Sequence, residues 1–290
     1  IFYGMRRVPC IVAGIKAAIK YRRRFGIYTE PRVLEGASGA MRLAQSLLTE
    51  GRLRKHADFV LAIGAHGRRW FRWAGYAESR LFPAAYFLDL RGAYAKFSPS
   101  AHAEEVPNVA FLGRMEPLKG FDRFLQSIPQ IRNPVRILTA GSGSLAGRAE
   151  ELARSTANFS YAGVIPMSTV PEFLSEIDIL VLPSITMDDG WGAVVSEALM
   201  AGAAIVTSDK VGASMCLVGG KRGLVVPPHS APAIAQAIDA LIDQRLLGSE
   251  HRLERSRWAA EHLDQAAGAA YLLRVFDHLY AGRERPAGFL

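Results

Sequence analysis

Three neighbouring segments between residues 178 and 209 indicate the fold most clearly. They are Asp178-Ile-Leu-Val-Leu-Pro-Ser184, Asp188-Asp-Gly-Trp-Gly-Ala-Val-Val-Ser-Glu-Ala-Leu-Met-Ala-Gly202 and Ala204-Ile-Val-Thr-Ser-Asp209. The outer two are apolar runs that predict buried strands, and the middle one predicts a glycine-containing loop that leads into a helix. The free N–H groups and the dipole at such a helix start attract anions. Two nearby carboxylates, Asp189 and Glu197, suit hydroxyl groups, so this stretch predicts a site for a phosphorylated sugar compound.

The same alternation extends over residues 109–243. The expected strands are Val109–Arg114, Val135–Ala140, Phe159–Gly163, Asp178–Ser184, Ala204–Ser208 and Gly223–Pro227. The expected helices are Phe121–Gln130, Leu145–Arg154, Val170–Ile177, Trp191–Met200 and Ala231–Asp243. Strands that alternate with helices pair in parallel through right-handed crossovers, which predicts one doubly wound α/β domain. Ligands of such sheets bind at the carboxyl ends of the strands.

Residues 1–100 contain fewer elements of the same kind. The expected strands are Gly26–Glu30 and Asp58–Ile63, and the expected helices are Gly39–Leu53 and His66–Ala74. These are too few for a complete second sheet, and the chain begins with Ile1. We therefore expect that it starts inside a longer protein and that its first domain is incomplete.

Two further segments suggest the domain boundaries. Residues 93–108 contain Ser98-Pro-Ser100 and predict a linker, and Trp258–Leu279 has the pattern of one long amphipathic helix. We accordingly expect a partial first domain over residues 1–104, a second domain over residues 105–257 and a terminal helical segment over residues 258–290.

The composition is that of a globular protein. The chain has 290 residues, 50% of them hydrophobic and 21% charged, which is enough for two domains of ordinary size. Cys10 and Cys216 lie far apart within apolar stretches, so we expect reduced thiols and neither a disulfide nor a metal site. Apolar runs are short and interrupted by charges, so no transmembrane segment is expected.

Positive charge is concentrated in the first third of the chain. Residues 1–100 carry 18 Lys/Arg and 6 Asp/Glu, a net charge of +12, whereas residues 101–290 carry 17 and 21, a net charge of −4. The run Arg68-Arg-Trp-Phe-Arg-Trp73 interleaves cations with aromatic rings, as membrane-surface segments do. A solvated helix face with buried rings is the alternative. Nucleic acid is not expected as a partner, because no nucleic-acid-binding motif accompanies the charge.

Cations follow the first strand of the second domain. Gly113-Arg114 ends that strand, and Lys119-Gly120 precedes the next helix. Two cations over one strand end can neutralise a diphosphate, and arginine does so with a fork of N–H donors. A solvated surface loop is the alternative interpretation.

A glycine-rich turn, Gly141-Ser142-Gly143, follows the next strand and continues to Ala146. It matches a variant of the dinucleotide fingerprint and makes an NAD-dependent oxidoreductase an alternative function. That fingerprint requires an acid about 20 residues on, and the strand Phe159–Gly163 ends without one. Close access to phosphate or ribose therefore fits the turn better, and a purely structural turn remains open.

The two carboxylates of the opening stretch differ in their surroundings. Asp189 precedes the helix and can turn towards the strand ends, and Asp188 could exchange roles with it. Glu197 lies among apolar neighbours such as Val195 and Leu199, and a carboxylate in such company needs a partner. The alternative is that Asp189 caps the helix and Glu197 is surface charge.

Together these pieces resemble the retaining nucleotide-sugar glycosyltransferases of family 4, whose fold is called GT-B. The matching pieces are Gly113-Arg114, Lys119-Gly120, Gly141-Ser-Gly143, Leu182-Pro-Ser184, Asp189-Gly-Trp-Gly192, Glu197-Ala198, Gly202 and Gly223-Leu-Val-Val-Pro227. The resemblance covers residues 109–243 well and residues 1–100 loosely. Asp189 stands where the family has the first of two glutamates, and Trp191 replaces a usual phenylalanine. The fold that this implies has two Rossmann-like domains with parallel sheets, and Trp258–Leu279 resembles the terminal helix that crosses back to the first domain.

The resemblance also implies roles for individual residues. Arg114 and Lys119 would hold the diphosphate of the donor and stabilise the leaving group, and Asp189 would contact the transferred sugar. Glu197 would bind the ribose hydroxyls. The other donor-binding residues implied are Gly113, Gly141, Ser142, Gly143, Gly190, Trp191, Gly192 and Ala193, the last three through backbone N–H groups near the diphosphate.

The implied activity is hexosyl transfer from a nucleoside-diphosphate sugar to a lipid-linked or polysaccharide acceptor, with no metal or other cofactor. Glu30 is a candidate on the acceptor side, or an ordinary loop acid before a proline. The expected location is the cytoplasm, peripheral on the inner membrane face, with anionic lipid as a partner of the basic first half. A non-catalytic module that binds sugar nucleotides or a protein partner is the alternative from another class.

Overall fold

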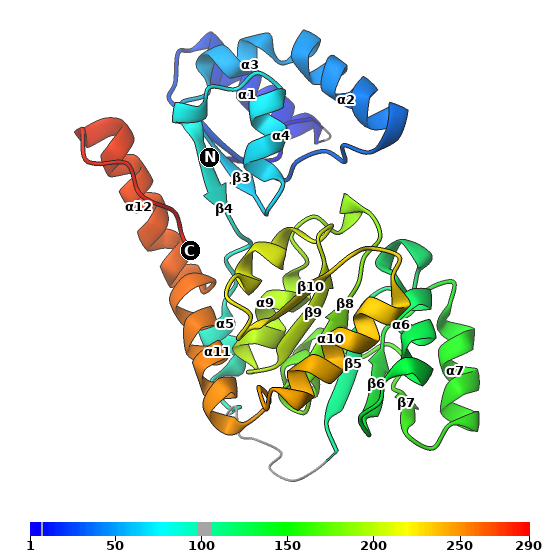
Figure 1. Ribbon diagram of the computed structural model, residues 1–290. Helices are drawn as coiled ribbons and strands as arrows, with labels where there is room; N and C mark the ends of the chain where they lie inside the picture. Colours follow the sequence, from blue (N-terminus) through cyan, green and yellow to red (C-terminus); the bar gives the residue numbers. More distant parts are fainter. Residues whose placement is uncertain (7, 98–105) are drawn as a thin grey trace. The chain divides into compact units, whose positions relative to one another are not determined.

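The computed structural model describes residues 1–6, 8–97 and 106–290, in two compact units (Figure 1). Ile1–Tyr86 and Ala266–Leu290 form the first unit, and Phe87–Gln265 form the second. The chain passes from one unit to the other at residues 86/87 and 265/266, whereas the sequence analysis expected domain boundaries at 104/105 and 257/258. Residues 98–105, half of the expected linker over residues 93–108, lie outside the described residues.

The second unit is built on a parallel sheet, which has six strands in its described part. These are β5 (Asn108–Leu112), β6 (Arg136–Ala140), β7 (Phe159–Tyr161), β8 (Ile179–Leu182), β9 (Ala204–Ser208) and β10 (Gly223–Val226). They confirm the six strands predicted from the sequence. Their order is β10-β9-β8-β5-β6-β7, with every neighbouring pair parallel. The order reverses between β5 and β8, so the carboxyl ends of these two strands form the switch point of a doubly wound sheet.

Helices connect these strands as predicted. They are α6 (Phe121–Ser127), α7 (Ala146–Ser155), α8 (Val170–Ser175), α9 (Ala193–Met200) and α10 (Ala231–Asp243). Short 3-10 turns precede or follow them: η2 (Pro117–Lys119), η3 (Ile128–Gln130), η4 (Met167–Thr169), η5 (Met187–Asp189) and η6 (Gly212–Leu217). Two helical segments described in the second unit were not predicted, α5 (Leu90–Tyr94) and the part of α11 (Ser249–His262) before Trp258. The buried side of α11 contains Arg252 and Arg255, and a sequence pattern assigns such charged residues to solvent.

The expected single helix over Trp258–Leu279 is wrong. In the structure α11 ends at His262, and α12 (Gln265–Ala281) begins after two intervening residues. The cause is the buried carboxylate of Asp264, which accepts a hydrogen bond from the backbone N–H of Arg91 at 3.0 Å. The backbone N–H of Gln265 donates to the carbonyl of Leu88 at 2.8 Å, so the chain pairs with another segment where a helix would need its own bonds.

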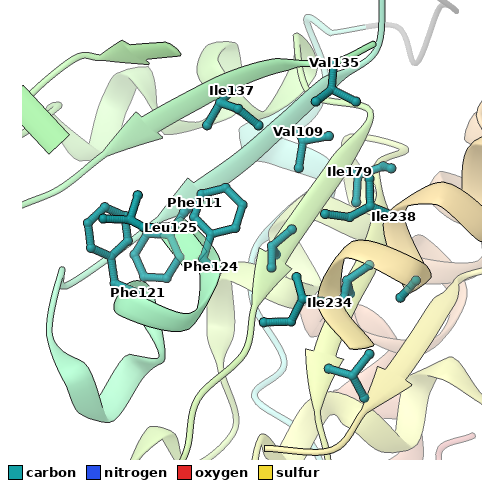
Figure 2. Packing of buried hydrophobic residues seen from close by; sticks show 14 of the residues in the cluster. Val109, Phe111, Phe121, Phe124, Leu125, Val135, Ile137, Ile179, Ile234 and Ile238 are labelled. Carbon is teal, nitrogen blue, oxygen red and sulfur yellow. The ribbon is translucent and has the colours of Figure 1, made fainter. Parts of the chain in front are cut away.

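One face of the six-stranded sheet packs on α6, α7 and α10 (Figure 2). Alternate strand residues such as Val109, Phe111 and Ile179 point into this core, as the period of two in a strand requires. Phe111 lies 4.7 Å from Phe121 and 6.0 Å from Phe124 between ring centroids. Each buried phenylalanine contributes about 1.5–3 kcal/mol, so this cluster anchors the loop between β5 and α6.

The first unit has a parallel sheet of four strands in its described part, in the order β1-β2-β3-β4. The strands are β1 (Phe2–Tyr3), β2 (Gly26–Thr29), β3 (Phe59–Ile63) and β4 (Leu81–Ala84). Its helices are α1 (Pro9–Lys20), α2 (Gly36–Thr49), α3 (Gly51–His56), α4 (Gly67–Trp73), the turn η1 (Glu78–Arg80) and α12. The strand β4 was not predicted from the sequence because it contains Pro83. A proline is tolerated there because β4 is an edge strand of the described sheet and pairs with β3.

Another difference in the first unit has a clear cause. The helix expected over Gly39–Leu53 is divided at Glu50, whose buried carboxylate binds Arg6 at 2.6 Å and the Tyr76 hydroxyl at 2.9 Å. The resemblance implies that the terminal helix crosses back to the first domain, and in the structure α12 belongs to the first unit and contacts its sheet. Phe276 of that helix lies 5.8 Å from Phe59 between ring centroids.

Candidate functional site

The loops after β5 and β8 contact each other at the switch point of the second unit, through a hydrogen bond and a close backbone approach. The backbone N–H of Ile185 donates to the carbonyl of Leu118 at 3.0 Å. Gly120 has a φ of +71°, and a Cβ atom there would lie 2.1 Å from the carbonyl oxygen of Pro183. Only glycine allows both the conformation and this approach. The residues that the sequence placed on these two loops therefore come together.

Lys119 and Asp189 form an ion pair at this point, and the hydroxyl of Ser184 donates to the second carboxylate oxygen. The two charged side chains are 14% and 7% exposed, so the pair is largely removed from water. The prediction placed Lys119 and Asp189 in one site but did not anticipate that they bind each other. Asp188 is exposed and bonds to Thr186, so it does not exchange roles with Asp189.

Arg114 is exposed and follows Gly113 at the end of β5. Its neighbour Glu116 reaches across to the loop after β6, where it accepts hydrogen bonds from the Ser144 N–H at 2.8 Å and hydroxyl at 2.5 Å. These two bonds, with a smaller contribution from the Arg114 charge, lower the pKa of the Glu116 carboxyl. Glu116 and Ser144 were not singled out in the sequence, because nothing in their spacing indicates that they meet.

The glycines of the β6 turn bring two backbones into close contact. A Cβ atom on Gly141 would lie 1.9 Å from the Gly113 carbonyl oxygen, and one on Gly143 would lie 2.6 Å from that of Met115. Met115 in turn donates its N–H to the carbonyl of Ser142 at 2.8 Å. These glycines are therefore required where the turn meets the loop after β5.

This geometry argues against a dinucleotide fingerprint. The fingerprint belongs after the first strand of its domain, whereas this turn follows β6, the neighbour of the earlier strand β5. The next strand, β7, ends at Tyr161, whose hydroxyl donates to the Gly141 carbonyl at 2.9 Å. A tyrosine bonded to the backbone stands where the fingerprint has an acid for ribose.

The start of α9 is held by η6. The N–H groups of Gly212 and Ala213 donate at 2.8 Å to the carbonyls of Gly190 and Trp191, respectively. Gly192 precedes the helix with a φ of +80° and makes no side-chain cap. The N–H groups of Ala193 and Val194 have no preceding turn of helix to bind, so they can meet an anion, whereas the Val195 N–H donates to the Gly192 carbonyl at 2.9 Å.

The Trp191 side chain anchors the loop before α9. Its indole is fully buried and donates to the Ser196 hydroxyl of α9 at 2.9 Å. The ligand contact expected of the Trp191 backbone N–H stays a prediction.

Glu197 is half-buried on α9, and burial raises the pKa of its carboxyl. Within the described residues no hydrogen bond or ion pair reaches this carboxylate. Tyr94 of α5 lies close to it: its pKa is raised mainly by burial and further by the negative charge of Glu197. The Tyr94 hydroxyl is buried and has no hydrogen-bond partner in the part of the chain that is described. The sequence did not single out Tyr94, which lies at the edge of the expected linker.

Glu30 lies in the first unit, directly after β2. Its carboxylate accepts a hydrogen bond from the Tyr86 hydroxyl at 2.5 Å, and that hydroxyl is 2.9 Å from the hydroxyl of Tyr3. Burial, and next the bond to Glu30, raise the pKa of Tyr86. The candidate acid is therefore held in a cluster of tyrosines at the carboxyl edge of its sheet.

Comparison with known proteins agrees with this geometry. Residues 106–244 match the family model described as glycosyl transferases group 1. The chain is 25% identical over 225 residues to the phosphatidyl-myo-inositol mannosyltransferase of Mycobacterium tuberculosis, which covers 75% of this chain and 58% of that protein. It is 30% identical over 148 residues to the D-inositol 3-phosphate glycosyltransferase of Rhodococcus erythropolis, covering 46% of this chain and 33% of that protein. The chain thus spans less than two thirds of these relatives.

Solved structures share the fold. The structure of Anabaena HepE in complex with UDP has a TM-score of 0.72 at 15% identity and covers 92% of this chain and 76% of its own. The lipopolysaccharide outer core galactosyltransferase WaaB, without ligand, has a TM-score of 0.68 at 13% identity and covers 94% and 72%. The two parallel-sheet units therefore have the GT-B fold that the sequence predicted, and residues 106–244 are similar to the glycosyl transferases group 1 family.

Proposed function

We propose that this protein is a retaining glycosyltransferase that moves a hexose from a nucleoside-diphosphate sugar to a lipid-linked or polysaccharide acceptor. The observation that carries the proposal is the position of Lys119 and the start of α9 at the switch point of a group 1 domain. Relatives named as mannosyltransferases of phosphatidyl-myo-inositol, and a HepE structure that holds UDP-glucose, support donor and acceptor of these kinds.

The chemistry requires stabilisation of a leaving group. Breaking the bond between the anomeric carbon and the phosphate oxygen leaves negative charge on the nucleoside diphosphate. Fixed cations and N–H groups aimed at that charge lower the barrier without reorganisation. We assign this to Arg114, Lys119 and the N–H groups of residues 191–193. In this proposal the cations replace a metal ion, and no other cofactor takes part.

The remaining donor contacts follow the same geometry. Glu197, whose carboxylate lacks a partner in the described structure, would accept hydrogen bonds from the ribose hydroxyls. The turn Gly141–Gly143, with Gly113 beside it, would let the backbone approach the donor. Asp189 belongs to this site through Lys119. Glu30 would contribute to the acceptor side from the first unit.

We also propose that the protein works at the cytoplasmic face of a membrane, attracted to anionic lipid by its basic first third. Within Arg68–Trp73, Trp70 and Phe71 are buried, Arg68 pairs with Glu78, and Trp73 is 45% exposed with Arg69 over its ring. An exposed indole beside a cation suits a lipid interface. No helix in the described ranges is long and apolar enough to cross a bilayer.

The test is transfer of label from nucleotide sugars. The chain would be incubated with radiolabelled UDP- and GDP-sugars and a membrane extract, and the anomeric configuration of the product would be assigned by NMR. Transfer with retention supports the proposal, and inversion would refute the retaining mechanism. Binding of UDP or GDP by calorimetry, with neither transfer nor donor hydrolysis, would support the non-catalytic module instead. The pairing of Asp189 within the protein is the observation that favours that second function.

A further inference from the structure

Asp189 uses both of its carboxylate oxygens within the protein. Its partners are Lys119, 70 residues earlier in the sequence, and Ser184 at the end of β8. The Asp189 side chain is only 7% exposed, so little of its carboxylate surface is left for a ligand. Aspartate is also one methylene shorter than the glutamate that the family resemblance places here.

The partners of Asp189 are themselves fixed. The Ser208 hydroxyl of β9 donates to the backbone carbonyl of Ser184 at 2.5 Å, and both serines are fully buried. Support therefore runs from Ser208 through Ser184 and Asp189 to the ammonium of Lys119. Buried networks whose members are satisfied hold a single arrangement of their side chains.

A lysine is the residue that gains most from such support. Its long side chain has many rotamers, and fixing it on binding costs conformational entropy. A carboxylate that fixes the ammonium beforehand removes part of that cost from the binding step. An ammonium group has three N–H donors, so holding one carboxylate is compatible with contacting a phosphate.

We propose that Asp189 is a positioning residue, which holds Lys119 for the donor diphosphate, and is not a ligand of the transferred sugar. This inference rests on the proposed function. It differs from the role that the resemblance implies, in which this position contacts the sugar. It also assigns a role to Ser184, which orients the Asp189 carboxylate.

Affinities for ligands with and without the sugar distinguish a positioning role of Asp189 from a direct contact with the sugar. Calorimetry on the full chain would compare UDP with UDP-glucose, and GDP with GDP-mannose. A positioning residue predicts that Asp189→Asn weakens both members of a pair by the same factor, about tenfold for a lost charge-assisted bond. The nucleoside monophosphates, which lack the second phosphate, would lose much less. Asp188→Asn is the matched control, since Asp188 is a neighbouring acid that is exposed and accepts a hydrogen bond from Thr186.

Two further variants separate positioning from misfolding. Ser184→Ala keeps the charge of Asp189 and should weaken UDP and UDP-glucose in parallel, by a smaller factor. In a Lys119→Met background, Asp189→Asn should have no further effect on UDP affinity. A loss confined to UDP-glucose, or an unchanged or raised affinity for UDP, would overturn the inference while leaving the proposed function intact. If the wild-type chain binds neither UDP nor GDP, the proposed function fails and the inference fails with it.

Discussion

Replacing Tyr94 by phenylalanine tests the polar interior beside Glu197. The Tyr94 hydroxyl is buried without a hydrogen-bond partner in the described structure, on a side chain that is 4% exposed. A buried hydroxyl that lacks a bond costs about 1–3 kcal/mol. Phenylalanine keeps the ring and removes the hydroxyl, so we expect Tyr94→Phe to stabilise the second unit by about 1 kcal/mol.

Tyr76→Phe is the matched control, because Tyr76 is also 4% exposed. Its hydroxyl donates to the Glu50 carboxylate at 2.9 Å. Removing a bond to a charged group costs about 1.5–3 kcal/mol, so this variant should destabilise the first unit. The same chemical change therefore has opposite signs at two equally buried tyrosines.

The assay is equilibrium unfolding in urea. With a slope of about 2 kcal/mol per molar urea, Tyr94→Phe should raise the midpoint of the second unit by about 0.5 M. Tyr76→Phe should lower that of the first unit by about 1 M. Hydrogen exchange on peptides of each unit, followed through the urea series, assigns each transition. If Tyr94→Phe is instead destabilised by about 1 kcal/mol or more, the Tyr94 hydroxyl makes a hydrogen bond in the folded protein, and the idea that it costs stability is wrong.

Three other substitutions test separate parts of the second unit. Burial raises the folded-state pKa of Glu197 above its unfolded value of 4.5, so the wild-type protein loses stability as pH rises through the folded pKa. In urea titrations, Glu197→Gln should therefore be more stable than wild type near pH 7 and should lose that advantage near pH 4. Gly141→Ala places a Cβ 1.9 Å from the Gly113 carbonyl oxygen and should cost about 3 kcal/mol of unfolding free energy, whereas Gly147→Ala, with open space in α7, should cost nothing. Arg252→Met leaves a buried carboxylate without its cation and should lower unfolding free energy by about 3–5 kcal/mol; a loss under 1 kcal/mol would contradict the importance of that pair.

The strands of the second unit could be predicted because each of them has a recognisable local sequence pattern. Runs such as Ile179–Leu182 are apolar at every position, since they are buried on both faces, and glycines or charges bound them. The helices between them repeat apolar residues at the helical period. Parallel pairing and right-handed crossovers then leave few arrangements, and the structure gives the strand order that puts the switch point between β5 and β8.

The first unit was harder to predict for physical reasons. The strand Phe2–Tyr3 is too short to show a period, and Leu81–Ala84 contains a proline that an edge position tolerates. The helix breaks at Glu50 and Asp264 depend on buried carboxylates that bind distant groups. A local sequence pattern cannot show such partners.

Local sequence patterns account for the doubly wound sheet, the loops that carry the functional side chains and the glycines that lead into α9. These features depend on local periodicity and on backbone conformation, which neighbouring residues encode. The contacts of Asp189 with Lys119 and Ser184, and the position of Tyr94 beside Glu197, appear only in the folded protein. Each of these relations joins side chains from different elements, so it exists only once packing has brought those elements together and removed the groups from water.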